Sequence, residues 1–152
     1  MSFRLTGLPA EPFRELFDLT EEALALRRAQ RMTAQTGVPC RISLTDATPG
    51  DEVILVNYEH QPAGTPYRAS HAIFVRRDEQ RFDAIDEIPA QLRRRLLSVR
   101  GFDSTHMLCA ADVVEGEQLT FLIERLFDHA EIDYLHVHYA RHGCYAARID
   151  RV

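Results

Sequence analysis

The strongest constraint on the fold is a pair of short apolar runs that flank a long polar insert. The runs cover residues 53–56 and 72–75, and the chain between them reads NYEHQPAGTPYRASH. Apolar runs of this length are typical of strands that are buried on both faces. We therefore expect 53–58 and 71–76 to pair as an antiparallel hairpin.

The insert of this hairpin is longer than a turn requires, because a hairpin closes with about two to five residues. Loops that are held on a rigid sheet often carry binding residues. Pro62 and Pro66 restrict the backbone, so the side chains beside them should be held in a fixed position. The stretch 57–75 is therefore the first candidate for a site, with the side chains of Tyr58, Glu59, His60, Tyr67, Arg68, Ser70 and His71.

Helical periodicity is clearest in residues 119–127, where five apolar residues form one continuous stripe. Such a stripe is typical of a helix that lies on a sheet. Arg93, Arg94 and Arg95 follow a short helical pattern and are interpreted as its solvated side. The other expected elements are strands at 3–6, 29–34, 40–45, 98–102 and 107–114, a helical segment around 13–17, and a helix capped by Thr20.

The chain ends in a second hairpin whose register follows from its alternation. A three-residue loop at 141–143 places Gly143 in the left-handed conformation that such loops require. A slip by one residue would move every side chain to the other face. We therefore expect one buried face, with His136 and His138 on the opposite, polar face, and the pairs Leu135–Ile149, Val137–Ala147 and Tyr139–Tyr145.

Strands that cluster as hairpins, with helices between the clusters, favour an α+β fold over alternating βαβ units. The 152 residues fit one domain with a normal core. We expect a single domain over residues 1–152, with a mainly antiparallel sheet and helices packed mostly on one face.

Composition excludes several classes of protein. The net charge of −5 argues against a nucleic-acid partner, and no apolar run approaches the roughly 18 residues of a membrane helix. Charged residues interrupt the first fifteen positions, where a secretory signal needs an apolar core, so a cytoplasmic location is expected. The three cysteines, Cys40, Cys109 and Cys144, are widely spaced and are expected to be free thiols.

Four segments of the chain resemble a known family: PCRISLTDATPGDE, NYEHQ, PYRASHAIFVR and GCYAARID. They resemble a bacterial family catalogued as domain of unknown function 1203, and the resemblance spans essentially the whole chain. It implies a soluble single-domain protein of about this size. It brings no assigned activity and no catalytic residues to transfer.

Metal and nucleophile chemistry are two alternatives for the function. The C-terminal hairpin contains His136, His138, His142 and Cys144 with the pattern H-x-H-x3-H-x-C, and imidazole and thiolate both suit zinc. The guanidinium of Arg148 opposite His136 disfavours a dication, so we expect no metal there. Cys40 and Cys144 are the better nucleophile candidates, because nearby Arg or His favours a thiolate, whereas Ser70 and His71 should point to opposite faces.

An anion site is the preferred hypothesis. All eighteen basic residues are Arg, whose planar fork binds carboxylate or phosphate through two hydrogen bonds. Arg41, Arg68 and Arg148 would converge with His136 and His138 if their strands shared one sheet face, and these histidines could act as acid or base. The candidate ligand-binding residues are Arg41, Tyr58, His60, Tyr67, Arg68, His138 and Arg148, and the candidate catalytic residues are His71, His136 and Cys144.

The sequence therefore favours recognition of a small anionic metabolite, with possible acid/base chemistry. The alternatives are a protein-interaction module without a pocket and a metal- or cysteine-dependent enzyme. No particular cofactor is indicated, and the oligomeric state stays open.

Overall fold

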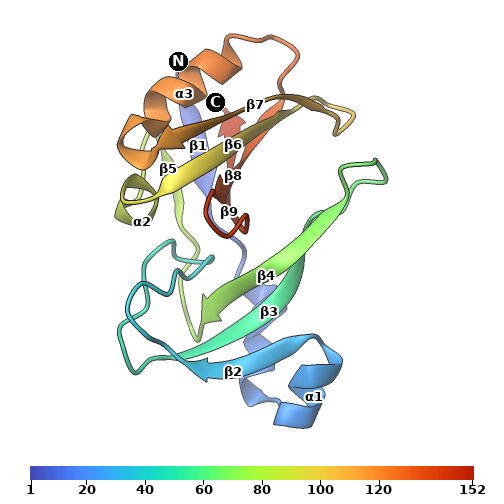
Figure 1. The fold of residues 1–152 in the computed structure, drawn as a ribbon, viewed down its shortest axis with the longest axis vertical. Coiled ribbons are helices and arrows are strands. Elements are labelled where there is room, and N and C mark those ends of the chain that lie inside the picture. The colour runs from blue at the N-terminus through green and yellow to red at the C-terminus, as the bar shows by residue number, and fades with distance from the viewer.

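Two antiparallel sheets form the framework of the computed structural model, which describes residues 1–152 (Figure 1). The large sheet has the strand order β5-β1-β9-β8-β6-β7, and the small sheet has the order β2-β3-β4. The large sheet contains β1 (Phe3–Thr6), β5 (Asp83–Ile85), β6 (Leu96–Phe102), β7 (Leu108–Glu115), β8 (Tyr134–Tyr139) and β9 (Tyr145–Arg151). The small sheet contains β2 (Ala29–Thr33), β3 (Glu52–Gln61) and β4 (Ala69–Arg76).

The helices are divided between the two sheets. The α+β class with mainly antiparallel pairing is confirmed, but the expected gathering of the helices on one face is not observed. Helix α1 contacts β2, and α3 contacts β7 (Figure 1). The helical elements are η1 (Glu11–Asp18), α1 (Glu21–Leu26), α2 (Ala90–Arg93), η2 (Gly116–Gln118) and α3 (Leu119–Phe127).

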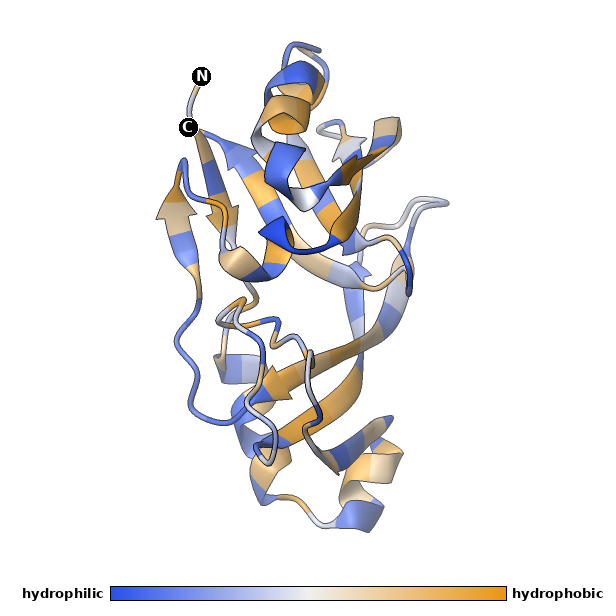
Figure 2. Ribbon diagram, turned by 60° about the vertical axis from the view of Figure 1, so that its left-hand side comes forward, coloured by the Kyte–Doolittle hydropathy of each residue, from blue (hydrophilic) through white to orange (hydrophobic).

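Each sheet has its own apolar core, and Figure 2 shows hydrophobic segments along β3, β4 and α3. The stripe predicted for 119–127 is confirmed, since all five of its apolar residues are buried against Leu135, Val137 and Ile149. The second core joins Phe13, Leu16 and Phe17 of η1 to the small sheet. Thr20 caps α1 as predicted, because its side chain accepts a hydrogen bond from the Ala23 amide.

The predicted antiparallel pairing of the first hairpin is confirmed, and in its register Tyr58 lies opposite His71 and Val53 opposite Arg76. Its strands are longer than predicted, so the loop is reduced to residues 62–68. This loop reaches the large sheet, where the ring of Tyr67 packs against Phe102 with centroids 6.2 Å apart.

The C-terminal hairpin follows the prediction at one end only. The pairs Leu135–Ile149 and Val137–Ala147 are confirmed, and Gly143 has a φ of 77°. The pair Tyr139–Tyr145 is wrong, because a bulge after Val137 places His138 opposite Tyr145. The turn causes this shift, since the Tyr139 amide donates to the Cys144 carbonyl and the Gly143 amide donates to the Tyr139 carbonyl. Tyr145 consequently packs in the core of the small sheet, whereas Tyr139 stays in that of the large sheet.

The strand predicted for 40–45 is wrong, because this segment is a mostly buried part of the connection from β2 to β3. Arg41 and Ile42 make their backbone hydrogen bonds with three separate segments, at Leu8, Phe74 and Phe82. Only single bridges form here, such as Cys40 with Phe74. The alternation of apolar residues arises from burial on several sides and not from one neighbouring strand.

Gly7 allows this connection to pass close to β1. A Cβ atom at Gly7 would collide with the backbone oxygen of Ile42 and would lie 2.9 Å from that of Arg41. We expect Gly7→Ala to destabilise the protein by roughly 3 kcal/mol, at the upper end of the overpacking range, because backbone atoms cannot yield as a side chain does. Gly64→Ala is the control, since nothing lies within 4 Å of that position, and it should stay within about 0.5 kcal/mol. Equal urea midpoints for the two variants would contradict this account.

Candidate functional site

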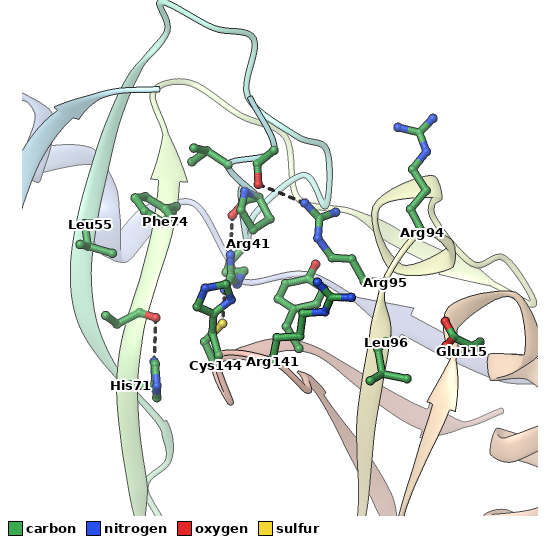
Figure 3. Close-up of a pocket in the computed structure, with 16 residues that line it drawn as sticks. Arg41, Leu55, His71, Phe74, Arg94, Arg95, Leu96, Glu115, Arg141 and Cys144 are labelled. Carbon is green, nitrogen blue, oxygen red and sulfur yellow. Dashed lines mark hydrogen bonds between the residues drawn. The ribbon is translucent and has the colours of Figure 1, made fainter. Parts of the chain in front are cut away.

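A cleft of about 710 Å³ opens between the two sheets (Figure 3). One side is formed by β3 and β4, and the other by residues 94–96 and the end of β7. The loop at 37–39, Arg41 and the turn between β8 and β9 complete the wall. The site therefore depends on how the two sheets are held relative to each other.

Arg41 is the buried cation of this cleft, with a relative exposure of 1%. Its Nε donates to the Tyr145 carbonyl at 2.7 Å and its Nη1 to the Pro39 carbonyl at 2.6 Å. Its Nη2 donates to Cys144 Sγ at 3.0 Å (Figure 3). No carboxylate pairs with Arg41, and a buried charge without a counter-ion is costly. Two of its five N–H donors remain unused.

Further positive charge surrounds Arg41. Arg94, Arg95 and Arg141 also line the cleft, and Glu115 is the single carboxylate among the lining residues. Arg95 pairs with Asp46 at 3.1 Å, whereas Arg94 and Arg141 are exposed and form no ion pair. His71 and His142 line the cleft as well. In a protein of net charge −5, the cleft is a local positive region.

The ring of Tyr139 positions two of these guanidinium groups. The Cζ atoms of Arg41 and Arg95 lie 4.8 and 5.1 Å from the ring centroid, within the range of cation–π contacts. The Tyr139 hydroxyl donates to Gln91 Oε1, and burial raises the pKa of this hydroxyl. Tyr139 therefore stays neutral beside the two cations.

The cleft also has an apolar side. Leu55 and Phe74 come from the small sheet, Val38 from the loop at 37–39 and Leu96 from the start of β6. Figure 3 shows Leu55 and Phe74 across the cleft from Arg95 and Leu96. The arrangement suits a molecule that has one charged end and an apolar body.

A second group of polar side chains lies deeper between the sheets. His136 and His138 lie on the face of β8 opposite Leu135 and Val137, as expected, but this polar face is buried, and their exposures are 3% and 1%. The reason is that the small sheet covers the face of β8 that carries the two histidines. Helix α3 packs on the opposite face, which carries Leu135 and Val137. The ring of His60 on β3 lies 4.9 Å from that of His138 and 6.2 Å from that of His136.

These three histidines are neutral over the physiological range. Burial is the main cause that lowers the pKa of His60 to about 4, that of His136 to about 2 and that of His138 to about 3. The positive charge of Arg100 lowers all three pKa values further.

The residues predicted to form one site are divided among three places. Arg41, His71 and Cys144 line the cleft, whereas Tyr58, His60, His136 and His138 surround Tyr145. The predicted convergence of Arg41, Arg68 and Arg148 is wrong, because the last two bind carboxylates elsewhere. Arg68 forms a fork with Glu59, at 3.0 and 3.2 Å, and remains 60% exposed. Arg148 binds Asp150 at 2.7 Å and lies over the ring of Tyr134.

Arg94, Arg95 and Arg141 line the cleft, although the sequence did not indicate them as site residues. Of the three arginines interpreted as a solvated helix side, only Arg93 lies outside the cleft. The available signal was local: Arg141 and His142 lie within three residues of Cys144, which was a candidate. The positions of Arg94 and Arg95 depend on long-range packing.

No group of three or more His, Cys, Asp and Glu side chains is arranged to hold a metal ion. The sulfur of Cys144 contacts Arg41 and does not join His136 and His138. None of the helices has the length and apolar character needed to cross a membrane.

Comparison with known proteins identifies one family. The family described as "Protein of unknown function (DUF1203)" matches residues 37–151, which include every cleft residue and the buried histidines. No curated protein and no solved structure matches the chain.

The buried histidines predict a steep loss of stability in acid. In the unfolded chain a histidine titrates near pH 6.5, so below that pH the unfolded state binds more protons and unfolding becomes easier. His136 and His138 should each contribute about 1.4 kcal/mol per pH unit between about pH 6 and 5. His136→Phe keeps an aromatic ring but cannot take up a proton on unfolding. The slope of the unfolding free energy against pH should therefore fall by about 1.4 kcal/mol per pH unit in this range, measured by urea unfolding at pH 5 to 8.

Phe102→Leu is the control, because Phe102 packs against the ring of His136 and does not titrate. It should lower stability by a similar amount at every pH. An unchanged pH dependence in His136→Phe would contradict the assignment of a buried neutral imidazole.

Proposed function

The chain belongs to the DUF1203 family of proteins of unknown function, and we propose that it binds a small anionic molecule in the cleft between its two sheets. The observation that carries this proposal is the buried guanidinium of Arg41, which has no carboxylate partner although it is 1% exposed. An anion in the cleft supplies the missing counter-charge.

The residues around Arg41 support the same ligand class. Arg141 and Arg94 line the cleft and form no ion pair, so they are free to bind the acidic group as it enters. Leu55 and Phe74 offer apolar contact to the rest of the molecule. Pockets that combine an apolar lining with a few convergent polar groups are the usual form of small-molecule sites. We therefore propose a carboxylate or phosphate that carries an apolar group.

Acid/base chemistry in this cleft would fall to His71. The Nδ1 atom of His71 lies 3.1 Å from the carbonyl oxygen of the next residue, Ala72. A carbonyl oxygen can only accept a hydrogen bond. The proton therefore lies on Nδ1 in the neutral ring, and Nε2 carries the lone pair. We propose His71 as the base candidate and Cys144 as a contact residue, whereas His136 lies outside the cleft.

Arg141→Ala tests the proposed binding. The side chain is exposed and unpaired, so stability should change by less than about 0.5 kcal/mol. The loss of a hydrogen bond to a charged group should weaken binding by about 1.5–3 kcal/mol, which is roughly 10- to 150-fold. The measurement is a thermal-shift screen of small carboxylates and phosphate monoesters, with and without apolar groups, followed by calorimetry of the hits.

Arg94→Ala and Arg93→Ala form a matched pair for this experiment. Both residues are exposed at the end of α2, but only Arg94 lines the cleft. Arg94→Ala should weaken binding and Arg93→Ala should not. Hits that shift the wild type, Arg141→Ala and Arg94→Ala equally would place the ligand outside the cleft.

A further inference from the structure

The face of the large sheet that points toward the small sheet carries an unusual set of polar residues on neighbouring strands. Arg100 on β6 lies directly opposite His136 on β8, and Ser98 lies opposite His138. Residues that face each other across a ladder project to the same side. His60 approaches them from β3. None of these side chains is part of the cleft wall.

Several of these groups have no partner within the protein. His60 Nδ1, His136 Nδ1 and His138 Nε2 are buried ring nitrogens without a hydrogen bond. The guanidinium of Arg100 is half-buried and forms neither a hydrogen bond nor an ion pair. Buried polar atoms are almost always satisfied, so three unsatisfied nitrogens beside one unpaired cation indicate a ligand.

The charges around the cluster decide which kind of ligand fits. The charged groups that act on the imidazoles are cations: Arg100 from β6, Arg148 from β9 and, when protonated, His71 from β4. Two carboxylates lie on the strands around the cluster, and both are paired: Asp150 on β9 is bound to Arg148, and Glu59, next to His60 on β3, is bound to Arg68. The aromatic neighbours of the imidazoles are the uncharged rings of Phe102, Tyr134 and Tyr145. A divalent cation would be repelled, whereas an anion would be attracted.

The tautomer of His138 shows how an anion would be held. Its Nδ1 lies 3.0 Å from the Gly143 carbonyl, so Nδ1 carries the proton and the unpartnered Nε2 has only a lone pair. An anion accepts hydrogen bonds and cannot pair with that lone pair. Binding therefore requires a proton from solvent on Nε2, which makes the ring a cation with both of its N–H groups bonded.

We propose that Arg100, His60, His136 and His138 form a second anion site, which takes an oxyanion together with a proton. Arg100 supplies the permanent charge, and the half-exposed Arg100 and His60 provide access from solvent. The site is independent of the proposed cleft ligand because it uses different residues. His71 links the two sites, since it lines the cleft and, when protonated, acts electrostatically on His60 and His138.

The test uses sodium sulfate, which does not titrate near neutral pH. Calorimetric titrations at pH 6 and pH 8 are run at constant ionic strength, in two buffers of different ionisation heat. We expect affinity to be at least about tenfold higher at pH 6, with about one proton taken up per sulfate bound. Arg100→Gln should weaken binding at least about tenfold at pH 6, while circular dichroism verifies that each variant is folded.

Variants separate the two sites. Arg141→Ala removes a cleft cation and should leave the pH-dependent sulfate binding intact, and Arg93→Gln controls for the loss of one surface charge. Binding that survives in Arg100→Gln but is lost in Arg141→Ala would assign the sulfate to the cleft and overturn the proposal. The absence of binding at both pH values, or binding without proton uptake, would overturn it as well.

Discussion

The arrangement of the two sheets depends on the buried guanidinium of Arg41, which connects segments that are far apart in the sequence. Its three hydrogen bonds join the connection at 39–41 to the start of β9, through the Pro39 and Tyr145 carbonyls and Cys144 Sγ. Its contact with the ring of Tyr139 adds the end of β8. Because the Arg41 amide also donates to the Phe74 carbonyl of β4, this one residue links the two sheets beside the cleft. Replacing it would alter both the fold and the cleft.

The location of the apolar cores explains why the space between the sheets is polar. The largest core lies where α3 covers the large sheet, and the second lies where η1 packs on the small sheet. Hydrophobic burial in these two places stabilises each sheet. The space between them can therefore hold Arg41, the cleft arginines and three neutral histidines. Such placement costs stability, and buried polar groups without partners are typical of functional regions.

Sequence reasoning succeeded where a pattern is local. The stripe of α3 and the Thr20 cap follow from spacing within one segment, and the pairing of β3 with β4 follows from two neighbouring apolar runs. It failed where distant segments decide the outcome. Residues 40–45 alternate like a strand, but their hydrogen bonds go to Leu8, Phe74 and Phe82, and no periodicity contains that information. The bulge before His138 depends on hydrogen bonds within the turn that follows. The candidate site was divided for the same reason: Arg41 was identified by its residue type, whereas its neighbours Arg94 and Arg141 come from other parts of the chain.

The most direct test of the account is to locate anions in crystals of the protein soaked in bromide or iodide. Anomalous scattering identifies each halide position without any assumption about the natural ligand. The account predicts a halide in the cleft, within hydrogen-bond distance of Arg41 or Arg141. Halides found only beside outer arginines such as Arg93 and Arg125, with none in the cleft, would show that its positive charge does not attract anions and would contradict the central claim.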